Sequence, residues 1–386
     1  MIRVANIIEE AKLGGPQIRI ANVAHALKGQ VETTVILPRQ NSDRFRKKLD
    51  TLDVPYETIR LSRITKELTA ALCYMLFSVF EMIHLVRYLR KEKFDLIHVS
   101  GGSWQYKGVI AGVMSKTKVI WHLNDTRMPW LFQKIFNLLS GLPDAYIFSS
   151  ERTRNYYSLL IRKDKKEYVI PAPVDTAVFT PEYINSSDDN VKSKWDGKIV
   201  IGTTANINPY KGLETLIRVA TKMKENGLNP IFIVVGEIHK NQKKYYDALL
   251  SLKNELLADN IYFVGGHDDI RPFLCRFDIY VCCSPAESSP ISVWEAMAMA
   301  KPIVSTNVGD VPLYVRNEHN GYIVDVGDSE TLVKCLSELA QNKEKRYEYG
   351  QRSRLIAVEK LARWPRITGL QSRKMARWPI LGHKVF

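Results

Sequence analysis

The sequence predicts an α/β protein made of two doubly wound parallel-sheet domains in tandem. Short runs rich in β-branched residues alternate with longer amphipathic segments through both halves of the chain, which is typical of a parallel sheet covered by helices on both faces. At 386 residues the chain is too long for one ordinary core. A Pro-Ala-Pro break at 171–173 and a polar stretch at 185–190 separate the two halves.

The expected elements follow in order along the chain. In the first half, strands are expected at residues 3–8, 33–38, 96–100, 118–122, 145–149 and 168–170, with helices at 17–27 and 68–90. In the second half, strands are expected at 199–203, 231–235, 261–264, 279–283, 303–306 and 321–324, with helices at 212–226 and 244–257. We place the first domain at 1–180, the second at 196–360 and a basic tail at 361–386. Because ligands of such sheets bind outside the carboxyl ends of the strands, the cleft between the domains is the expected site.

Composition excludes several classes of protein. The net charge is +14, but seven basic residues and no acidic ones fall in the last 27 residues, so the remainder is only mildly basic. No recognised nucleic-acid-binding module occurs, and nucleic acid is not an expected partner. The five cysteines form no C-x-x-C pair or cluster with metal-ligand spacing, which favours reduced, buried thiols. The chain opens directly on a strand pattern without a signal peptide, so we expect a cytoplasmic protein.

The most informative passage is Ser-Pro-Ala-Glu-Ser-Ser-Pro-Ile-Ser-Val-Trp-Glu-Ala-Met-Ala at 284–298. A hydrophobic strand ends just before it, and Glu287 lies in the following loop. Ser289 is expected to cap a helix that begins at Pro290 and contains Glu295. A helix N-terminus at the carboxyl end of a strand suits a diphosphate. Alone, the acidic pair also fits a plainer interpretation, with one carboxylate near a helix dipole and the other on a solvated face.

This passage resembles the signature of the retaining glycosyltransferases with the GT-B fold, family 4, which is Glu-x7-Glu followed by Ala-Met-Ala. The continuations Lys-Pro-Ile-Val-Ser-Thr at 301–306 and Asn-Gly-Tyr-Ile-Val at 320–324 are similar to the family as well. The resemblance runs from the first strand to about residue 360 and is looser in the first domain. It implies two Rossmann-like domains that face each other across a cleft, and transfer of a sugar from a nucleotide-diphosphate donor.

The resemblance also implies roles for individual residues. Glu287 would contact the donor sugar beside the reacting carbon, and Glu295 would hold the ribose. Residues 205–212 match the loop that usually carries an arginine and a lysine on the donor phosphates. Lys211 is in place, whereas Asn206 stands where the arginine usually is. Stabilisation of the departing diphosphate would then depend on Lys211 and helix amides, or on a different basic residue. Without the family, Lys211 and its following glycine also fit a simple helix-start loop.

Further donor-binding positions are expected in both domains. Gly14 and Gly15 follow the first strand and resemble the family's N-terminal Gly-Gly loop, whose backbone can approach a ligand closely, although a plain strand-to-helix turn fits them too. His122 matches a histidine that the family places near the donor sugar, and a structural role at a strand end is the alternative. Gly265 matches the segment that usually meets the nucleobase. The expected donor-binding set is completed by Ser288, Ser289 and Ile291.

We therefore expect a hexosyltransferase-like, retaining enzyme that needs neither a metal nor a cofactor besides its nucleotide-sugar donor. No Asp-x-Asp stands at a strand end to hold a metal ion. No candidate nucleophilic carboxylate is identified for a double displacement, which favours front-side transfer. The acceptor would be a glycan or a lipid-linked sugar in surface polysaccharide or glycolipid assembly. Two alternatives stay open: a GT-B nucleotide-sugar epimerase or hydrolase, and a non-catalytic sugar-nucleotide-binding scaffold.

Two segments carry open interpretations. Residues 68–89 are unusually apolar and are followed by basic residues, so they form either a buried helix or an interfacial helix on an anionic membrane surface at the inner face of the membrane. The apolar stretch at 70–80 is too short to span a bilayer. The tail repeats Ala-Arg-Trp-Pro at 362–365 and 376–379. It could cross back to the first domain, form a basic, aromatic membrane foot, or have no function.

Overall fold

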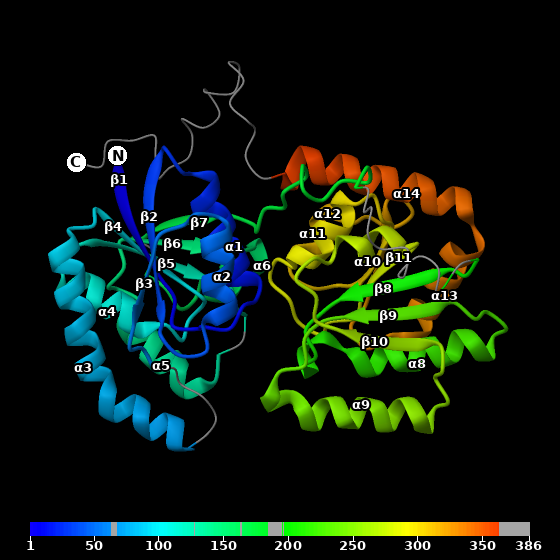
Figure 1. Cartoon of the computed structure of the whole chain (residues 1–386), viewed down its shortest axis with the longest axis horizontal. Coiled ribbons are helices and arrows are strands. Elements are labelled where there is room, and N and C mark those ends of the chain that lie inside the picture. The colour runs from blue at the N-terminus through cyan, green and yellow to red at the C-terminus, as the bar shows by residue number, and fades with distance from the viewer. Residues whose placement is uncertain (63–67, 127, 163, 184–194, 196, 363–386) are drawn as a thin grey trace, which may run out of the picture.

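Two α/β domains lie side by side in the computed structural model, which describes residues 1–62, 68–126, 128–162, 164–183, 195 and 197–362 (Figure 1). Every pairing between the named strands is parallel. The doubly wound fold class predicted from the sequence is therefore confirmed.

The first domain contains a seven-stranded sheet. Its strands, in spatial order, are β3 (Tyr56–Ile59), β2 (Val31–Pro38), β1 (Ile2–Ile7), β4 (Leu96–Ser100), β5 (Lys118–Leu123), β6 (Ala145–Phe148) and β7 (Lys166–Val169). Its helices are α1 (Gly15–Ala26), α2 (Asp43–Thr51), α3 (Leu68–Glu92), α4 (Tyr106–Met114), α5 (Trp130–Leu139) and α6 (Glu151–Tyr157). The edge strand β3 was not predicted, because it has only four residues, of which Ile59 alone is buried.

The second domain repeats this winding with six strands. Their spatial order is β10 (Ile261–Gly265), β9 (Ile231–Val235), β8 (Val200–Thr204), β11 (Ile279–Cys282), β12 (Ile303–Thr306) and β13 (Gly321–Val324). The helices are α8 (Leu213–Glu225), α9 (Lys243–Glu255), α10 (Arg271–Arg276), α11 (Ile291–Ala298), α12 (Val311–Tyr314), α13 (Ser329–Gln341) and α14 (Lys343–Ile356), with short turns η1 (Pro209–Lys211), η2 (Lys240–Gln242) and η3 (Ala357–Leu361). The central strands are buried throughout, and β9 and β11 have almost entirely apolar sequences.

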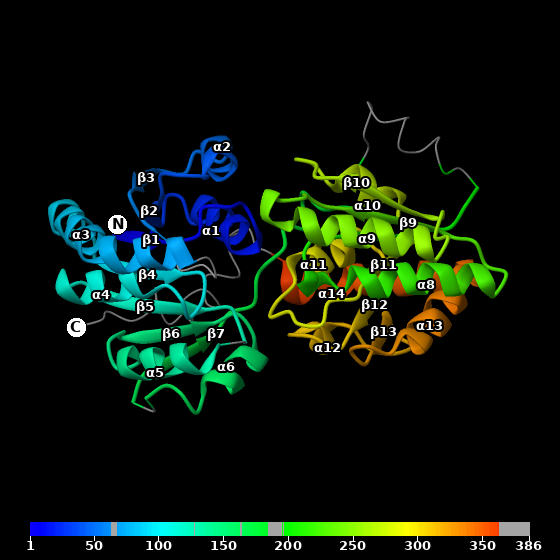
Figure 2. The same cartoon turned by 90° about the horizontal axis from the view of Figure 1, so that it is seen from below.

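Helices cover both faces of the second sheet (Figures 1 and 2). One core packs α8 and α13 against one face through residues such as Leu216 and Leu336. The other core packs α11 and η3 against the opposite face through residues such as Trp294 and Leu361. In Figure 1 the arrowheads of β8 and β9 point toward the first domain, so the loops that follow these strands lie at the boundary between the domains.

The segment that enters the second domain is held by the end of the described chain. Val174 donates its backbone N–H to the Leu361 carbonyl at 2.9 Å, and Val174 also pairs with Ala362 in an isolated bridge. The Arg354 guanidinium donates to the carbonyls of Phe179 and Thr176 at 2.8 and 3.0 Å. These contacts fix the crossover between the two sheets. The interpretations offered for residues 363–386 lie outside the described residues.

A buried ion pair anchors α3 to α4 in the first domain. Lys107 is 1% exposed and Glu81 7%, and the two side chains form a salt bridge. Lys107 Nζ also donates to the carbonyl and the hydroxyl of Ser62, both at 2.8 Å. The Ser62 N–H donates to both Glu81 oxygens at 3.0 Å. The two charges are thus paired and hydrogen-bonded, which offsets their desolvation.

Lys107→Met should lower the free energy of unfolding by about 3–5 kcal/mol, because Glu81 is left as an unpaired buried charge. Urea unfolding followed by circular dichroism measures the change. The double variant Lys107→Met/Glu81→Met should recover most of that loss. A double variant as unstable as Lys107→Met alone would contradict this account of the pair.

Candidate active site

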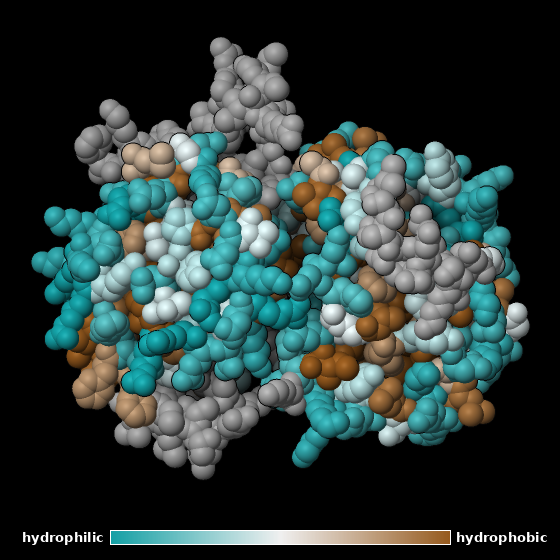
Figure 3. All heavy atoms as spheres, in the orientation of Figure 1, coloured by the Kyte–Doolittle hydropathy of each residue, from teal (hydrophilic) through white to brown (hydrophobic). Residues whose placement is uncertain are grey.

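A cavity of about 420 Å³ lies at the boundary between the domains. The first domain lines it with the loop before α1 and with α1 itself, and the second with the loops after β8 and β11. β8 and β11 are neighbours at the point where the strand order of the second sheet reverses. Such switch points are where open α/β sheets bind ligands. Mostly hydrophilic side chains line the visible boundary between the lobes (Figure 3).

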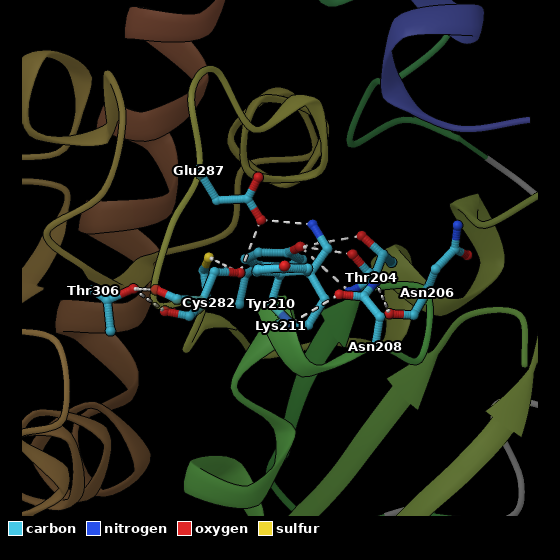
Figure 4. Close-up of polar contacts among 10 residues, drawn as sticks. Thr204, Asn206, Asn208, Tyr210, Lys211, Cys282, Glu287 and Thr306 are labelled. Carbon is cyan, nitrogen blue, oxygen red and sulfur yellow. Dashed lines mark hydrogen bonds and ion pairs between the residues drawn. The ribbon is translucent and has the colours of Figure 1, made fainter. Parts of the chain in front are cut away.

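A charged pair joins the loops after β8 and β11. Lys211 Nζ donates to Glu287 Oε1 at 2.6 Å, and Ser284 Oγ donates to the same oxygen at 2.9 Å (Figure 4). Burial alone would lower the pKa of Lys211, but the Glu287 carboxylate outweighs burial and the pKa is raised. Lys211 is therefore a fixed positive charge that faces the cleft. The structure brings together two predicted site residues that lie 76 positions apart in the sequence.

Glycine is required next to this pair. Gly212 has φ +62°, and a β-carbon there would lie 2.0 Å from the Cys283 carbonyl oxygen. Any other residue would push the β8 loop away from the end of β11. The Lys-Gly dipeptide therefore sets the close approach that lets Lys211 reach Glu287. Asn208 caps the turn that carries Lys211 by accepting the Tyr210 N–H at 3.0 Å.

Helix α11 directs its N-terminus at the cleft. Pro290 is the N-cap, and Ile291, the first helical residue, lines the cavity. The prediction that Ser289 caps this helix is wrong. The Ser289 hydroxyl instead accepts hydrogen bonds from the Trp294 indole and the Ala172 backbone, both at 3.1 Å. The first-turn amides are left free of a side-chain cap, and together with the helix dipole they favour an anion.

Ser288 joins the Glu287 loop to the first domain. Its Oγ lies 2.6 Å from Ser149 Oγ, 3.1 Å from Ser150 Oγ and 2.6 Å from Thr153 Oγ1. Both Ser288 and Ser289 line the cavity, as expected of donor-binding residues. In this structure, however, their hydroxyls contact the first domain. These contacts position the loop that carries Glu287.

Glu295 lies in the interior of α11 and lines the cavity while only 9% exposed. The alternative of a solvated helix position is therefore wrong. Burial raises the pKa of Glu295 to about 8, and Lys48 on α2 only partly offsets this shift. The carboxyl group is consequently mostly protonated at neutral pH in the free protein.

The remaining predicted positions are divided between the cavity and its surroundings. Gly14, Gly15 and Asn206 line the cavity. Asn206 Oδ1 accepts the Glu237 N–H at 3.2 Å, and Figure 4 shows its side chain pointing away from the Lys211–Glu287 pair. Gly265, with φ +83° at the end of β10, does not line the described cavity, whereas the next residue does.

His122 lies behind the wall of the cleft. It is 1% exposed and does not line the described cavity. Arg19 Nη1 lies 2.9 Å from Nδ1 and 2.8 Å from Nε2 of His122, and Arg19 does line the cavity. Burial, then the charge of Arg19, lowers the pKa of His122 well below its ordinary value. Sequence reasoning missed Arg19. The signal that could have found it was an arginine on the buried face of the helix that follows the Gly-Gly loop.

The described residues contain neither a metal-binding cluster nor a membrane-spanning helix. No group of three or more His, Cys, Asp or Glu side chains within them is arranged to hold a metal ion. Among their helices, none is both long enough and apolar enough to cross a membrane.

Two doubly wound domains facing a cleft with a cationic floor define a sugar-nucleotide-dependent transferase of the GT-B class. The family comparison agrees: the Glycosyltransferase Family 4 model matches residues 13–178, and the model for Glycosyl transferases group 1 matches residues 185–355. The chain belongs to the group 1, family 4 glycosyltransferases, and the resemblance seen in the sequence is confirmed.

Individual relatives are distant. The chain is 23% identical, over 68% of its length and 70% of the relative, to the Escherichia coli UDP-Gal:alpha-D-GlcNAc-diphosphoundecaprenol alpha-1,3-galactosyltransferase. It is 24% identical, over 83% of its length and 71% of the relative, to a phosphatidylinositol N-acetylglucosaminyltransferase GPI3 subunit of Saccharomyces cerevisiae. Its fold matches Anabaena Alr3699/HepE, solved with UDP and glucose, with a TM-score of 0.80 at 18% identity over 94% and 96% of the two chains.

The contribution of Glu295 to the free energy of unfolding should fall as pH rises from about 5 to 8, because folded Glu295 retains a proton that the unfolded chain releases near pH 4.5. Glu295→Gln removes this contribution. The stability of the variant relative to the wild type should therefore increase with pH, by about 2–4 kcal/mol at pH 9. Urea unfolding at several pH values measures it, with Glu225→Gln on the exposed surface of α8 as control. Parallel pH dependences in Glu295→Gln and wild type would contradict the prediction.

Proposed function

We propose that this glycosyltransferase moves a sugar from a nucleotide-diphosphate donor to a glycan or lipid-linked acceptor, with retention and without a metal ion. The observation that carries the proposal is the Lys211–Glu287 pair beside the N-terminus of α11. It places a fixed cation, free helix amides and a carboxylate in one cavity. A diphosphate and its sugar need these groups.

The donor fits this cavity in one orientation. The diphosphate would lie between Lys211, the first-turn amides of α11 and the Gly14–Gly15 backbone. On binding, Lys211 would exchange Glu287 for phosphate, and the released carboxylate would accept hydrogen bonds from the sugar hydroxyls. Glu295 would hold the ribose. The name of the Escherichia coli relative specifies UDP-Gal, and Anabaena Alr3699/HepE was solved with UDP and glucose, so UDP-sugars come first in any panel.

The charges in the cleft favour front-side transfer. Among the described residues, the acidic side chains that line the cavity are Glu237, Glu287 and Glu295. Glu237 pairs with Arg44, Glu287 pairs with Lys211, and Glu295 is mostly protonated. Glu237 and Glu295 are thus engaged or neutral, and Glu287, once released from Lys211, is assigned to the sugar hydroxyls. The proposal therefore gives none of the three the role of a nucleophile on the far face of the sugar.

In the proposed reaction, the acceptor oxygen bonds to the anomeric carbon as the bond from that carbon to the phosphate oxygen breaks. The acceptor hydroxyl proton passes to the leaving phosphate. Lys211 and the α11 amides stabilise the negative charge that grows on the diphosphate. Because these groups are already positive, the proposal assigns no step to a metal ion.

Lys211→Ala and Glu287→Gln should each lower turnover at least about 100-fold, because each removes a preorganised contact to the reacting groups. Nucleotide release from UDP-, GDP- and ADP-sugars, with and without lipid-phosphate acceptors and EDTA, measures the effect. Lys243→Ala, an exposed lysine on α9, is the matched control and should behave as wild type.

The same assay separates the alternatives. Product with a retained anomeric configuration, formed only with acceptor and insensitive to EDTA, is the expected result. Nucleotide release that does not depend on any acceptor would favour the hydrolase or epimerase alternative. Nucleotide binding without turnover would favour the scaffold. An inverted product or loss of activity in EDTA would overturn retention or metal independence respectively.

We also infer that α3 docks on an anionic membrane surface. Its buried face packs on the first domain through Leu85 and Leu89, and its other face exposes Phe77, Val79 and Phe80. Apolar side chains are visible over α3 at the lower left of Figure 3. The exposed face continues with the basic residues Arg87, Arg90 and Lys91. An apolar patch next to cations is typical of an interfacial helix.

Phe77→Ser/Phe80→Ser should weaken binding to vesicles of phosphatidylcholine and phosphatidylglycerol about tenfold or more, because each ring loses its burial in the interface. Co-sedimentation measures the binding. Leu257→Ser, which is equally exposed but lies in the second domain, should bind as wild type. Equal binding of the double variant and wild type, or equal binding to vesicles without phosphatidylglycerol, would contradict the inference.

A further inference from the structure

Arg19 is a buried cation that has no anionic partner among the described residues. It is 9% exposed and lies on the buried face of α1, four residues after Gly15. Its Nη1 contacts the ring of His122, whereas its Nη2 is buried and has no hydrogen-bond partner among the described residues. Within the same residues, no carboxylate forms an ion pair with Arg19. Burial lowers the pKa of Arg19 to about 10.

The groups around Arg19 cannot neutralise it. His122 contacts a second histidine, with His98 Nε2 3.1 Å from His122 Nδ1, and Asn6 Nδ2 lies 3.3 Å from His98 Nδ1. Burial, with Arg19 nearby, lowers the pKa of His98 to about 3. Both imidazoles are therefore neutral at pH 7, and His122 can accept a hydrogen bond from Nη1 without supplying charge. Burial of a guanidinium in this way costs free energy unless an anion pairs with it.

The position of Arg19 indicates where that anion would lie. Residues four apart share one face of a helix, so Arg19 lies one turn below Gly15 on the wall of the cleft. A β-carbon at Gly15 would lie 3.9 Å from Ile291 Cδ1, at the start of α11. Arg19 and Lys211 thus line one cavity from the two domains. Position 206 in the second domain is Asn, where the family usually has an arginine on the donor phosphates. A cation from the first domain could take the place of that missing charge.

We propose that Arg19 binds a substrate phosphate in the cleft and that His122 is the residue that positions it. The guanidinium is held at Nη1 and its Nη2 has no partner among the described residues, while Arg19 lines the cleft. Such a planar fork matches phosphate oxygens. The phosphate belongs either to the donor diphosphate or to a phosphorylated acceptor, and both present the same chemistry to Arg19. The inference rests on the proposed function only for the identity of these substrates.

Arg19→Gln tests the proposal by separating binding from stability. Calorimetric titration with UDP, GDP, ADP and inorganic pyrophosphate should show at least a tenfold loss of affinity for the ligands that wild type binds. The melting temperature of the ligand-free variant should stay the same or rise, because an unpaired buried charge is removed. The affinity of Arg19→Lys for these ligands should lie between the affinities of wild type and Arg19→Gln. Arg218 is an exposed arginine on α8, and the affinity of Arg218→Gln should match that of wild type.

The two sources of phosphate give different results. If the donor supplies it, affinity for nucleoside diphosphates and pyrophosphate falls. If the acceptor supplies it, those affinities hold, while KM rises for a phosphorylated acceptor and not for its dephosphorylated form. Unchanged affinities together with unchanged KM values overturn the proposal, and so does a ligand-free variant that melts lower without losing affinity. Wild type that binds no phosphate ligand and turns over no phosphorylated acceptor overturns it as well.

A double-mutant cycle tests the role given to His122. If His122 acts through Arg19, His122→Gln should weaken the same phosphate-dependent step, and Arg19→Gln/His122→Gln should be no worse than Arg19→Gln alone. Independent, multiplying effects on kcat would show that His122 acts on the reacting groups itself. The titrations need no turnover, so failure of this inference and failure of the proposed transferase activity can be told apart.

Discussion

The hydrogen-bonded pair between Lys211 and Glu287 is the interaction on which the candidate site depends. It joins the loops that leave β8 and β11, the two strands at the switch point of the second sheet. The left-handed Gly212 permits this contact, since any β-carbon would strike the Cys283 carbonyl. The loop that carries Glu287 then leads directly into α11. One close approach of backbone therefore places a cation, an anion and a helix N-terminus together.

Electrostatics in the cleft are asymmetric between its two walls. Lys211 on the second domain is matched by Glu287, whereas Arg19 on the first domain meets only a neutral imidazole. Glu295 adds no negative charge at neutral pH, because burial raises its pKa to about 8. The cleft therefore carries the unmatched positive charge of Arg19. A phosphate group would offset that charge with cations that are in place before it binds, which is the preorganisation that catalysis of charge separation requires.

Periodicity and motif spacing predicted most of the fold and the second-domain half of the site. All twelve strands predicted in the sequence match observed strands with each end within two residues. Edge strand β3 gave no signal, because a four-residue strand with one buried side chain has no detectable alternation. Ser289 was misjudged because serine before proline fits an N-cap locally, while the tertiary contact with Trp294 decides its orientation. Arg19 escaped notice since only the folded chain shows that a helical arginine is buried beside His122.

The contacts between the two domains differ in strength from one side of the cleft to the other, and this difference gives the cleft a direction in which to open. On one side, Arg44 of α2 pairs with Glu237 and Asp268, all at least one-third exposed, and such pairs contribute about 0–1 kcal/mol each. On the other side, the Ser288 hydroxyl lies among Ser149, Ser150 and Thr153 in a partly buried cluster. The crossover at Val174 is also fixed to the end of η3. Opening should therefore separate α2 from the second domain first. A phosphate that contacts both Arg19 and Lys211 would oppose that motion, because it would join the two walls of the cleft.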